Sequence, residues 1–175
     1  MSTQSKFIPT SSQTVGPYFR IGLRHLIECA PDSVTAGAVT IHGRVLDRDG
    51  APVSDAMLEF WSAQAETTSH TNEFPLGFRR AATDLDGAFT VTLPRPKPAE
   101  SQAPHLLVFV FARGLLRHLI TRVYFHDDDP ANATDAVLLS IPVERRSTLI
   151  ARLETNSFHW DIILQGTNET VFFAW

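Results

Sequence analysis

Alternation of apolar and polar side chains, interrupted by short polar turns, constrains the fold of this 175-residue chain more than any other feature. Residues 39–45 alternate in this way and stop at 47–50, Asp-Arg-Asp-Gly. Residues 89–93 repeat the pattern directly after 84–87, Asp-Leu-Asp-Gly. Because successive side chains of a strand point to opposite faces, the alternation predicts strands with one buried face, and Asp and Gly are frequent turn residues.

Further runs extend this pattern along the chain. Strand-like segments cover 57–61, 105–112, 119–125, 149–151, 158–165 and 170–173. The run 105–112 is apolar on both faces, which predicts a strand buried in the core. About eight short strands with little helix indicate an all-β chain of the β-sandwich class. We expect one such domain over 38–175, preceded by an N-terminal arm over 1–37 whose last part is either a short helix or irregular.

Composition excludes several classes of protein. A formal net charge of -4 and a pI near 5.9 argue against a nucleic-acid-binding protein, since phosphate binding needs clustered Lys and Arg. One cysteine, Cys29, cannot form an intrachain disulfide. The polar N-terminus lacks the apolar core of a signal peptide, and the longest apolar stretch, 106–112, is far shorter than the roughly 20 residues of a membrane helix. We therefore expect a soluble, cytoplasmic protein with no nucleic-acid or membrane partner.

The N-terminal segment contains candidate ligand-binding residues. Gly16 has no side chain and Pro17 lacks an N–H, so the backbone there can approach a ligand closely. Thr14 and Tyr18 add hydroxyl groups that could orient a polar aromatic molecule. Gly-Pro is also common in turns, so a structural turn is the alternative.

Arg113 is a second candidate. It follows the most apolar run of the sequence and precedes Gly114, which places a fixed cation at the end of a strand. A guanidinium can bind a carboxylate with two parallel hydrogen bonds. The alternative is an ordinary surface ion pair.

Candidate metal ligands are few. Arg122, Tyr124 and His126 alternate along one expected strand, so a site with Tyr and His ligands is conceivable, but only two ligands are evident. Residues 127–129 are three aspartates without the spacing or central glycine of an EF-hand loop, and we interpret them as a solvated acidic turn.

Several separate motifs together resemble one family. They are 12–18 (Ser-Gln-Thr-Val-Gly-Pro-Tyr), 44–61, 103–114 with its Phe-Ala-Arg-Gly ending, 121–125, 144–151 and 165–173. They resemble the intradiol aromatic-ring dioxygenases, and within that family the alpha subunits of the heteromeric enzymes that cleave protocatechuate. The resemblance implies an intradiol-dioxygenase-type β-sandwich with an irregular N-terminal arm.

The resemblance also implies where the metal lies. The family's ferric iron is held by two tyrosinates and two histidines, ligands that suit this hard cation. Its His-x-His pair matches 104–107, Pro-His-Leu-Leu, where His105 is kept but Leu107 takes the second position. No tyrosine occurs between Tyr18 and Tyr124. We therefore expect no metal in this chain and Fe(III) in a homologous beta subunit.

The implied activity is intradiol cleavage of 3,4-dihydroxybenzoate with O2 to 3-carboxy-cis,cis-muconate, in the β-ketoadipate pathway of aromatic degradation. This chain would be inactive alone and would carry no catalytic residue. Its arm would reach the partner's active site, where Thr14, Gly16, Pro17, Tyr18 and Arg113 would line the substrate pocket.

Two alternatives remain open at this point. One is a self-sufficient intradiol catechol dioxygenase with an unusual ligand set. The other is a non-catalytic β-sandwich binding module, because 43–56 also resembles the strand–turn–strand of carboxypeptidase-regulatory-like domains. Independently, the apolar residues Trp160, Phe172, Phe173 and Trp175 predict a C-terminus that needs a subunit contact to be covered.

Overall fold

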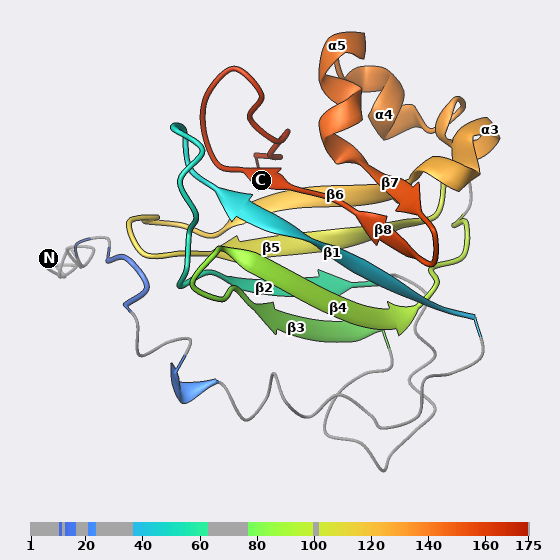
Figure 1. Cartoon of the computed structure of the whole chain (residues 1–175). Helices are drawn as coiled ribbons and strands as arrows, with labels where there is room; N and C mark the ends of the chain where they lie inside the picture. The colour runs from blue at the N-terminus through green and yellow to red at the C-terminus, as the bar shows by residue number, and fades with distance from the viewer. Residues whose placement is uncertain are drawn as a thin grey trace, which may run out of the picture.

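The computed structural model describes residues 11, 13–16, 21–23, 37–62, 77–99 and 102–174, and their strands form two packed layers (Figure 1). The strands are β1 (Ala38–Leu46), β2 (Met57–Trp61), β3 (Phe78–Ala82), β4 (Ala88–Pro94), β5 (His105–Phe111), β6 (Leu119–Phe125), β7 (Ile150–Glu154), β8 (Ser157–His159) and β9 (Ile162–Ile163). One layer runs β3-β2-β5-β6-β7 and the other runs β7-β8-β1-β4, while β9 pairs with β1. The predicted all-β sandwich is confirmed.

Strand β7 joins the two layers. It pairs in parallel with β6 through Tyr124↔Ile150 and antiparallel with β8 through Arg152↔His159. The first and last strands of this order, β3 and β4, contact each other, so the sheet is nearly closed. Closure of this kind leaves few strand edges exposed to unwanted pairing.

The two predicted turns are confirmed, and both have the same pattern of hydrogen bonds to the first aspartate of the turn. Asp47 Oδ1 accepts hydrogen bonds from the amides of Asp49 at 2.9 Å and Ala51 at 2.8 Å. Asp84 Oδ1 accepts from residues 86 and 88 at 2.9 and 2.8 Å. A side chain that binds the backbone two and four residues ahead fixes each turn locally, which is why the motif could be recognised in the sequence.

The core lies between the layers and is built by alternate residues. Along β5, Leu106, Val108 and Val110 are fully buried, whereas the residues between them are only partly buried. The prediction that both faces of 105–112 lie in the core is therefore wrong. The second face of β5 is an outer face of the sandwich, and it carries His105 and Leu107.

The segment between β6 and β7 is helical, which the sequence pattern did not reveal. It contains η1 (His126–Asp128), α3 (Asp129–Asn132), α4 (Ala136–Ser140), α5 (Val143–Arg146) and η2 (Ser147–Leu149), gathered at one end of the sandwich (Figure 1). The predicted acidic turn at 127–129 lies here, and it is not merely solvated. Asp127 and Asp128 both bind the guanidinium of Arg95, at 2.6 and 2.7 Å.

Most of the apolar C-terminus packs on this chain itself. Trp160 is only 3% exposed, and its indole N–H donates to the carbonyl of Thr148 at 2.9 Å. Phe172 and Phe173 are partly buried against the core clusters. Trp160 therefore needs no partner to cover it, Phe172 and Phe173 remain partly exposed, and Trp175 lies outside the described residues. The expected strand at 170–173 is extended chain without a strand of its own.

No helix in the described part of the chain is both long and apolar enough to cross a membrane.

Gly43 marks the closest approach of two backbones in the core. A Cβ atom at this position would lie 1.9 Å from the carbonyl oxygen of Trp160, which is far inside van der Waals contact. We expect Gly43→Ala to lower the free energy of unfolding by about 1–3 kcal/mol, because β1 must move away from Trp160. Urea denaturation measures the change.

Gly22→Ala is the matched control, since a Cβ there would meet no atom within 4 Å. Its expected effect is below about 0.5 kcal/mol. Equal unfolding midpoints for the two variants would contradict the steric argument.

Candidate functional site

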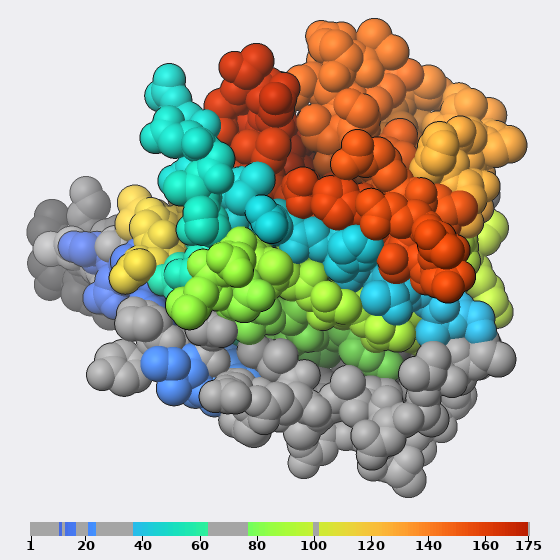
Figure 2. All heavy atoms as spheres, viewed as in Figure 1, coloured from blue at the N-terminus to red at the C-terminus, as the bar shows by residue number. Residues whose placement is uncertain are grey.

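Two of the segments singled out in the sequence meet in the structure. The amide of Gly114 donates a hydrogen bond to Thr14 Oγ1 at 2.7 Å, although the two residues are 100 positions apart. Figure 2 shows the described residues of the N-terminal segment (blue) beside the loop that follows β5 (yellow). The folded chain thus brings Thr14 next to the Phe-Ala-Arg-Gly motif that contains Arg113.

Arg113 lies at the tip of a tight turn. The amide of Leu115 donates to the carbonyl of Ala112 at 3.2 Å and closes the turn around Arg113 and Gly114. Gly114 has a φ of 92°, a conformation that side chains disfavour. The guanidinium is 67% exposed, and its Nε lies 3.1 Å from Oδ2 of the largely buried Asp55. The surface ion pair considered from the sequence therefore exists, and it leaves the cation open to solvent.

The remaining predicted site residues are less well placed. Gly16 is exposed, and a Cβ there would meet no atom within 4 Å. Pro17 and Tyr18 lie outside the described residues. The predicted role of all five residues as a substrate-pocket wall remains a prediction.

A pocket of about 190 Å³ adjoins these residues. Its lining comes from both segments: Gln13, Val15, Phe111, Ala112, Leu115, Leu116, Arg117 and His118. Sequence reasoning missed this pocket, although its residues lie within or directly after the two motifs.

The loop after β5 is exposed and positively charged. Leu116 is 63% exposed, and among the described residues no carboxylate is paired with Arg117. Arg113 and Arg117 lie within five residues, and among the described residues Asp55 is the one carboxylate paired with either of them. This excess of positive charge makes the loop suitable for an anionic ligand.

His105 and Leu107, the candidate ligand positions, lie on the outer face of β5. His105 Nδ1 lies 2.8 Å from the carbonyl oxygen of Ala103, so its ring is held by the backbone. Burial lowers the pKa of His105 and favours the neutral imidazole. Leu107 pairs with Arg122 across to β6. A leucine cannot bind a metal, so the strand offers one imidazole and no second ligand beside it.

Tyr124 is fully buried in a polar cluster next to His105. Its hydroxyl donates to Asp135 Oδ1 at 3.3 Å and accepts from the guanidinium of Arg122 at 3.2 Å. Burial raises the pKa of Tyr124 to about 12. The phenol therefore stays protonated at neutral pH, whereas a tyrosinate ligand must be ionised.

Asp135 organises this cluster. Its Oδ1 also accepts from the amides of Val137 and Leu138, each at 2.9 Å, at the start of α4. Its Oδ2 accepts from the amide of Ala103 at 2.9 Å, just before β5 begins. The buried carboxylate thus fixes both the helical segment and the entry to the strand that carries His105.

The described residues do not fit a tyrosinate–histidine iron site. Leu107 takes the position of a ligand, the Tyr124 hydroxyl is bound to Arg122 and Asp135, and within the described ranges no three His, Cys, Asp or Glu residues gather around a common point. The site with Tyr124 and His126 considered from the sequence also fails, because β6 ends at Phe125. His126 is exposed and lies 3.3 Å from Asp129.

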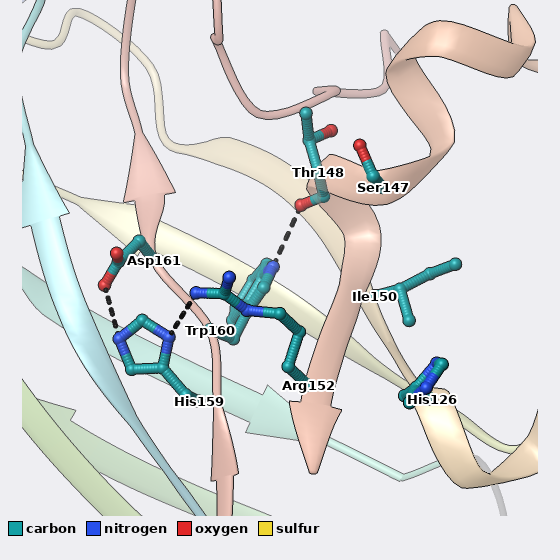
Figure 3. A pocket seen from close by; sticks show the side chains of 8 residues that line it. All are labelled: His126, Ser147, Thr148, Ile150, Arg152, His159, Trp160 and Asp161. Carbon is teal, nitrogen blue, oxygen red and sulfur yellow. Dashed lines mark hydrogen bonds and ion pairs between the residues drawn. The ribbon is translucent and has the colours of Figure 1, made fainter. Parts of the chain in front are cut away.

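A second pocket, of about 410 Å³, lies on the other layer (Figure 3). Its lining residues are His126, Ser147, Thr148, Ile150, Arg152, His159, Trp160 and Asp161. Arg152 lies 3.1 Å from His159 Nδ1, and His159 Nε2 lies 3.3 Å from Asp161 Oδ1. These polar groups bond to one another. His126, a candidate ligand considered from the sequence, lines this pocket, whereas Thr14, Gly16 and Arg113 do not.

The pKa of Tyr124 has a consequence at high pH. Its value rises from 10.0, the ordinary value, to about 12 in the folded chain. Between these values an unfolded chain loses the tyrosine proton and the folded chain keeps it, so the stabilisation is complete below pH 10 and is lost as the pH rises through 12.

We expect Tyr124→Phe to lose less stability than the wild type between pH 8 and pH 11.5, because phenylalanine has no proton to release. The measurement is the free energy of unfolding in urea at the two pH values. Equal losses in the two proteins would show that Tyr124 ionises as readily in the folded state as in the unfolded state.

Comparisons with known proteins agree with this architecture. A family model described as "Dioxygenase" matches residues 24–166. The protocatechuate 3,4-dioxygenase alpha chain of Burkholderia cepacia is 38% identical over 194 residues, which cover 94% of this chain and 96% of that protein. The alpha chain of Pseudomonas putida is 37% identical and covers 94% of this chain and 95% of its own length. The beta chain of the Burkholderia cepacia enzyme is 26% identical over 75% of this chain and 66% of its own length.

Solved structures show the same fold. The dioxygenase domain of a carbohydrate-binding fusion protein from Streptomyces sp. SirexAA-E superposes with a TM-score of 0.59 at 25% identity, covering 79% of this chain and 86% of that chain. Hydroxyquinol 1,2-dioxygenase from Pseudomonas putida DLL-E4 gives a TM-score of 0.58 at 22% identity, over 75% of this chain and 57% of that chain. The comparisons thus favour a dioxygenase over a carboxypeptidase-regulatory-like module, and the chain belongs to the intradiol ring-cleavage dioxygenase family.

Proposed function

We propose that this chain is the alpha, non-iron subunit of a protocatechuate 3,4-dioxygenase assembled from alpha and beta subunits. The observation that carries the proposal is the 38% identity to an alpha chain over 94% of this chain, against 26% to a beta chain over 75%. In the proposed reaction, 3,4-dihydroxybenzoate and O2 give 3-carboxy-cis,cis-muconate. The bond between the two hydroxylated carbons breaks, and both oxygen atoms enter the product.

Enzymes of this family use iron, and we assign the iron to the partner beta subunit. The chemistry of this chain supports the assignment, because Leu107 takes a ligand position and the Tyr124 hydroxyl is already bound to Arg122 and Asp135. When bound, the iron makes the catecholate ring susceptible to oxygen. The residues of this chain would help to bind the substrate and to orient it.

Arg113 is the residue to which we assign substrate attraction. Its exposed guanidinium can bind the carboxylate of the aromatic acid, and Arg117 adds a second positive charge to the same loop. The arm over 1–37 would reach the partner's cavity, where Gly16, Pro17 and Tyr18 would form part of the wall. The β-sandwich over 38–175 would hold the arm and the loop in place, in a soluble assembly in the cytoplasm.

Co-expression with the homologous beta chain tests the proposal. We expect the two chains to purify together, to contain one iron per pair, and to consume O2 as protocatechuate is cleaved. Stoichiometric iron in this chain alone, with the visible absorption of a tyrosinate-to-iron bond, would contradict it and identify a self-sufficient enzyme. A stable pair that binds no catechol would also contradict it.

Arg113→Ala in the assembled enzyme tests the role of the loop. We expect KM for protocatechuate to rise about tenfold, the equivalent of one charge-assisted hydrogen bond. The matched control is Arg152→Ala, which removes the same charge from an exposed arginine of the second pocket. If both variants change KM equally, the effect comes from net charge and not from contact with the substrate.

A further inference from the structure

The turn at residues 112–115 combines an internal hydrogen bond with a positive φ at Gly114. Arg113 and Gly114 occupy its two central positions, and the bond from the Leu115 amide to the Ala112 carbonyl closes it. The φ of 92° at Gly114 is that of the second central position in a type II turn. Type I and type II turns differ mainly by a flip of the central peptide, which here is the peptide between Arg113 and Gly114.

The hydroxyl of Thr14 binds this central peptide. The N–H that donates to Thr14 Oγ1 at 2.7 Å belongs to Gly114 and therefore to the peptide that would flip. In a type I turn this N–H would point away from its present direction, and the hydrogen bond would be lost. Thr14 thus stabilises the present conformation of the turn and holds the loop that carries Arg113 against the arm.

The same hydroxyl is already engaged on its donor side. Thr14 Oγ1 lies 3.4 Å from the carbonyl oxygen of Val15 and can donate its proton there. A hydroxyl has one proton to donate. The short bond to the Gly114 amide, at 2.7 Å, is thus the stronger of the two contacts of this hydroxyl.

The arm and the loop are coupled through this bond. Among the described residues of the arm, Thr14 makes the one side-chain hydrogen bond to the β-sandwich, while the carbonyl of Gly37 accepts from the amide of Arg95 at 3.2 Å. Gln13 and Val15 on either side of it line the pocket of about 190 Å³ without filling it. On the other side of the turn, Asp55 holds Nε of Arg113 at 3.1 Å.

We propose that Thr14 is a positioning residue for Arg113: by binding the Gly114 amide it holds the 112–115 turn against the arm and so keeps the guanidinium where it can bind the substrate carboxylate. The inference rests on the proposed function. It gives Thr14 a different part from the substrate-contacting one expected from the sequence, since Thr14 would act through Arg113. Docking of the arm and orientation of the guanidinium would then be a single event.

Steady-state kinetics of the assembled enzyme provide the first test. Thr14→Val removes the hydroxyl at nearly constant shape, and Thr14→Ser keeps it. We expect Thr14→Val to raise KM for protocatechuate about fivefold, the equivalent of one neutral hydrogen bond, while Thr14→Ser stays within about twofold of the wild type. The affinity for catechol, which lacks the carboxylate, should be the same in all three proteins.

A double-mutant cycle with Arg113→Ala separates positioning from direct contact. If Thr14 acts through Arg113, Thr14→Val has no further effect once the guanidinium is gone. If the two effects multiply, Thr14 contacts the substrate independently and the proposal is wrong. A wild-type KM in Thr14→Val overturns it as well.

Amide hydrogen exchange gives a readout that does not depend on ring cleavage. In the assembled, substrate-free protein, the Gly114 amide should exchange at least about fivefold faster in Thr14→Val than in the wild type or Thr14→Ser. Equal exchange in all three proteins would overturn the inference. Faster exchange together with no cleavage of protocatechuate would instead uphold the contact and reject the proposed function.

Discussion

The buried carboxylate of Asp135 is the interaction on which one end of the sandwich depends. It accepts hydrogen bonds from the amides of Ala103, Val137 and Leu138 and from the hydroxyl of Tyr124. A buried charge is tolerated only when its acceptor sites are filled, and a filled network is rigid. Through this one group, a helical segment that is too short to be stable alone is fixed to the strands β5 and β6.

Much of the fold could be predicted from sequence because the information was local. The strands β1 and β4 alternate clearly, and the turns at 47–50 and 84–87 carry their own hydrogen-bond acceptors. Strand β3 was missed because Phe-Arg-Arg-Ala-Ala places arginines where a strand pattern requires apolar residues. The helices between β6 and β7 have three to five residues each, which is too few for a helical period to be visible.

The candidate site was predictable only in pieces. Thr14 and Arg113 each stood out by residue type and by resemblance, but their proximity arises from the tertiary fold, which brings the arm onto the loop after β5. Asp55 carried no sequence signal, because an aspartate between two strands reads as a turn residue. Its role becomes visible only when its carboxylate is seen 3.1 Å from Nε of Arg113. The burial of Tyr124, which raises the pKa of its hydroxyl, was equally hidden.

The two faces of β5 have different roles, one in the core and one on the outer surface. Leu106 and Val108 fill the core, while His105 and Leu107 point to the outer face, where the family's ligand pair would stand. A strand of this kind can exchange a histidine for a leucine on its outer face without opening a cavity in the core. After a gene duplication, one copy can therefore give up metal binding and still keep the scaffold intact. Such tolerance makes this architecture suited to dividing catalysis and substrate capture between two descendants of one ancestor.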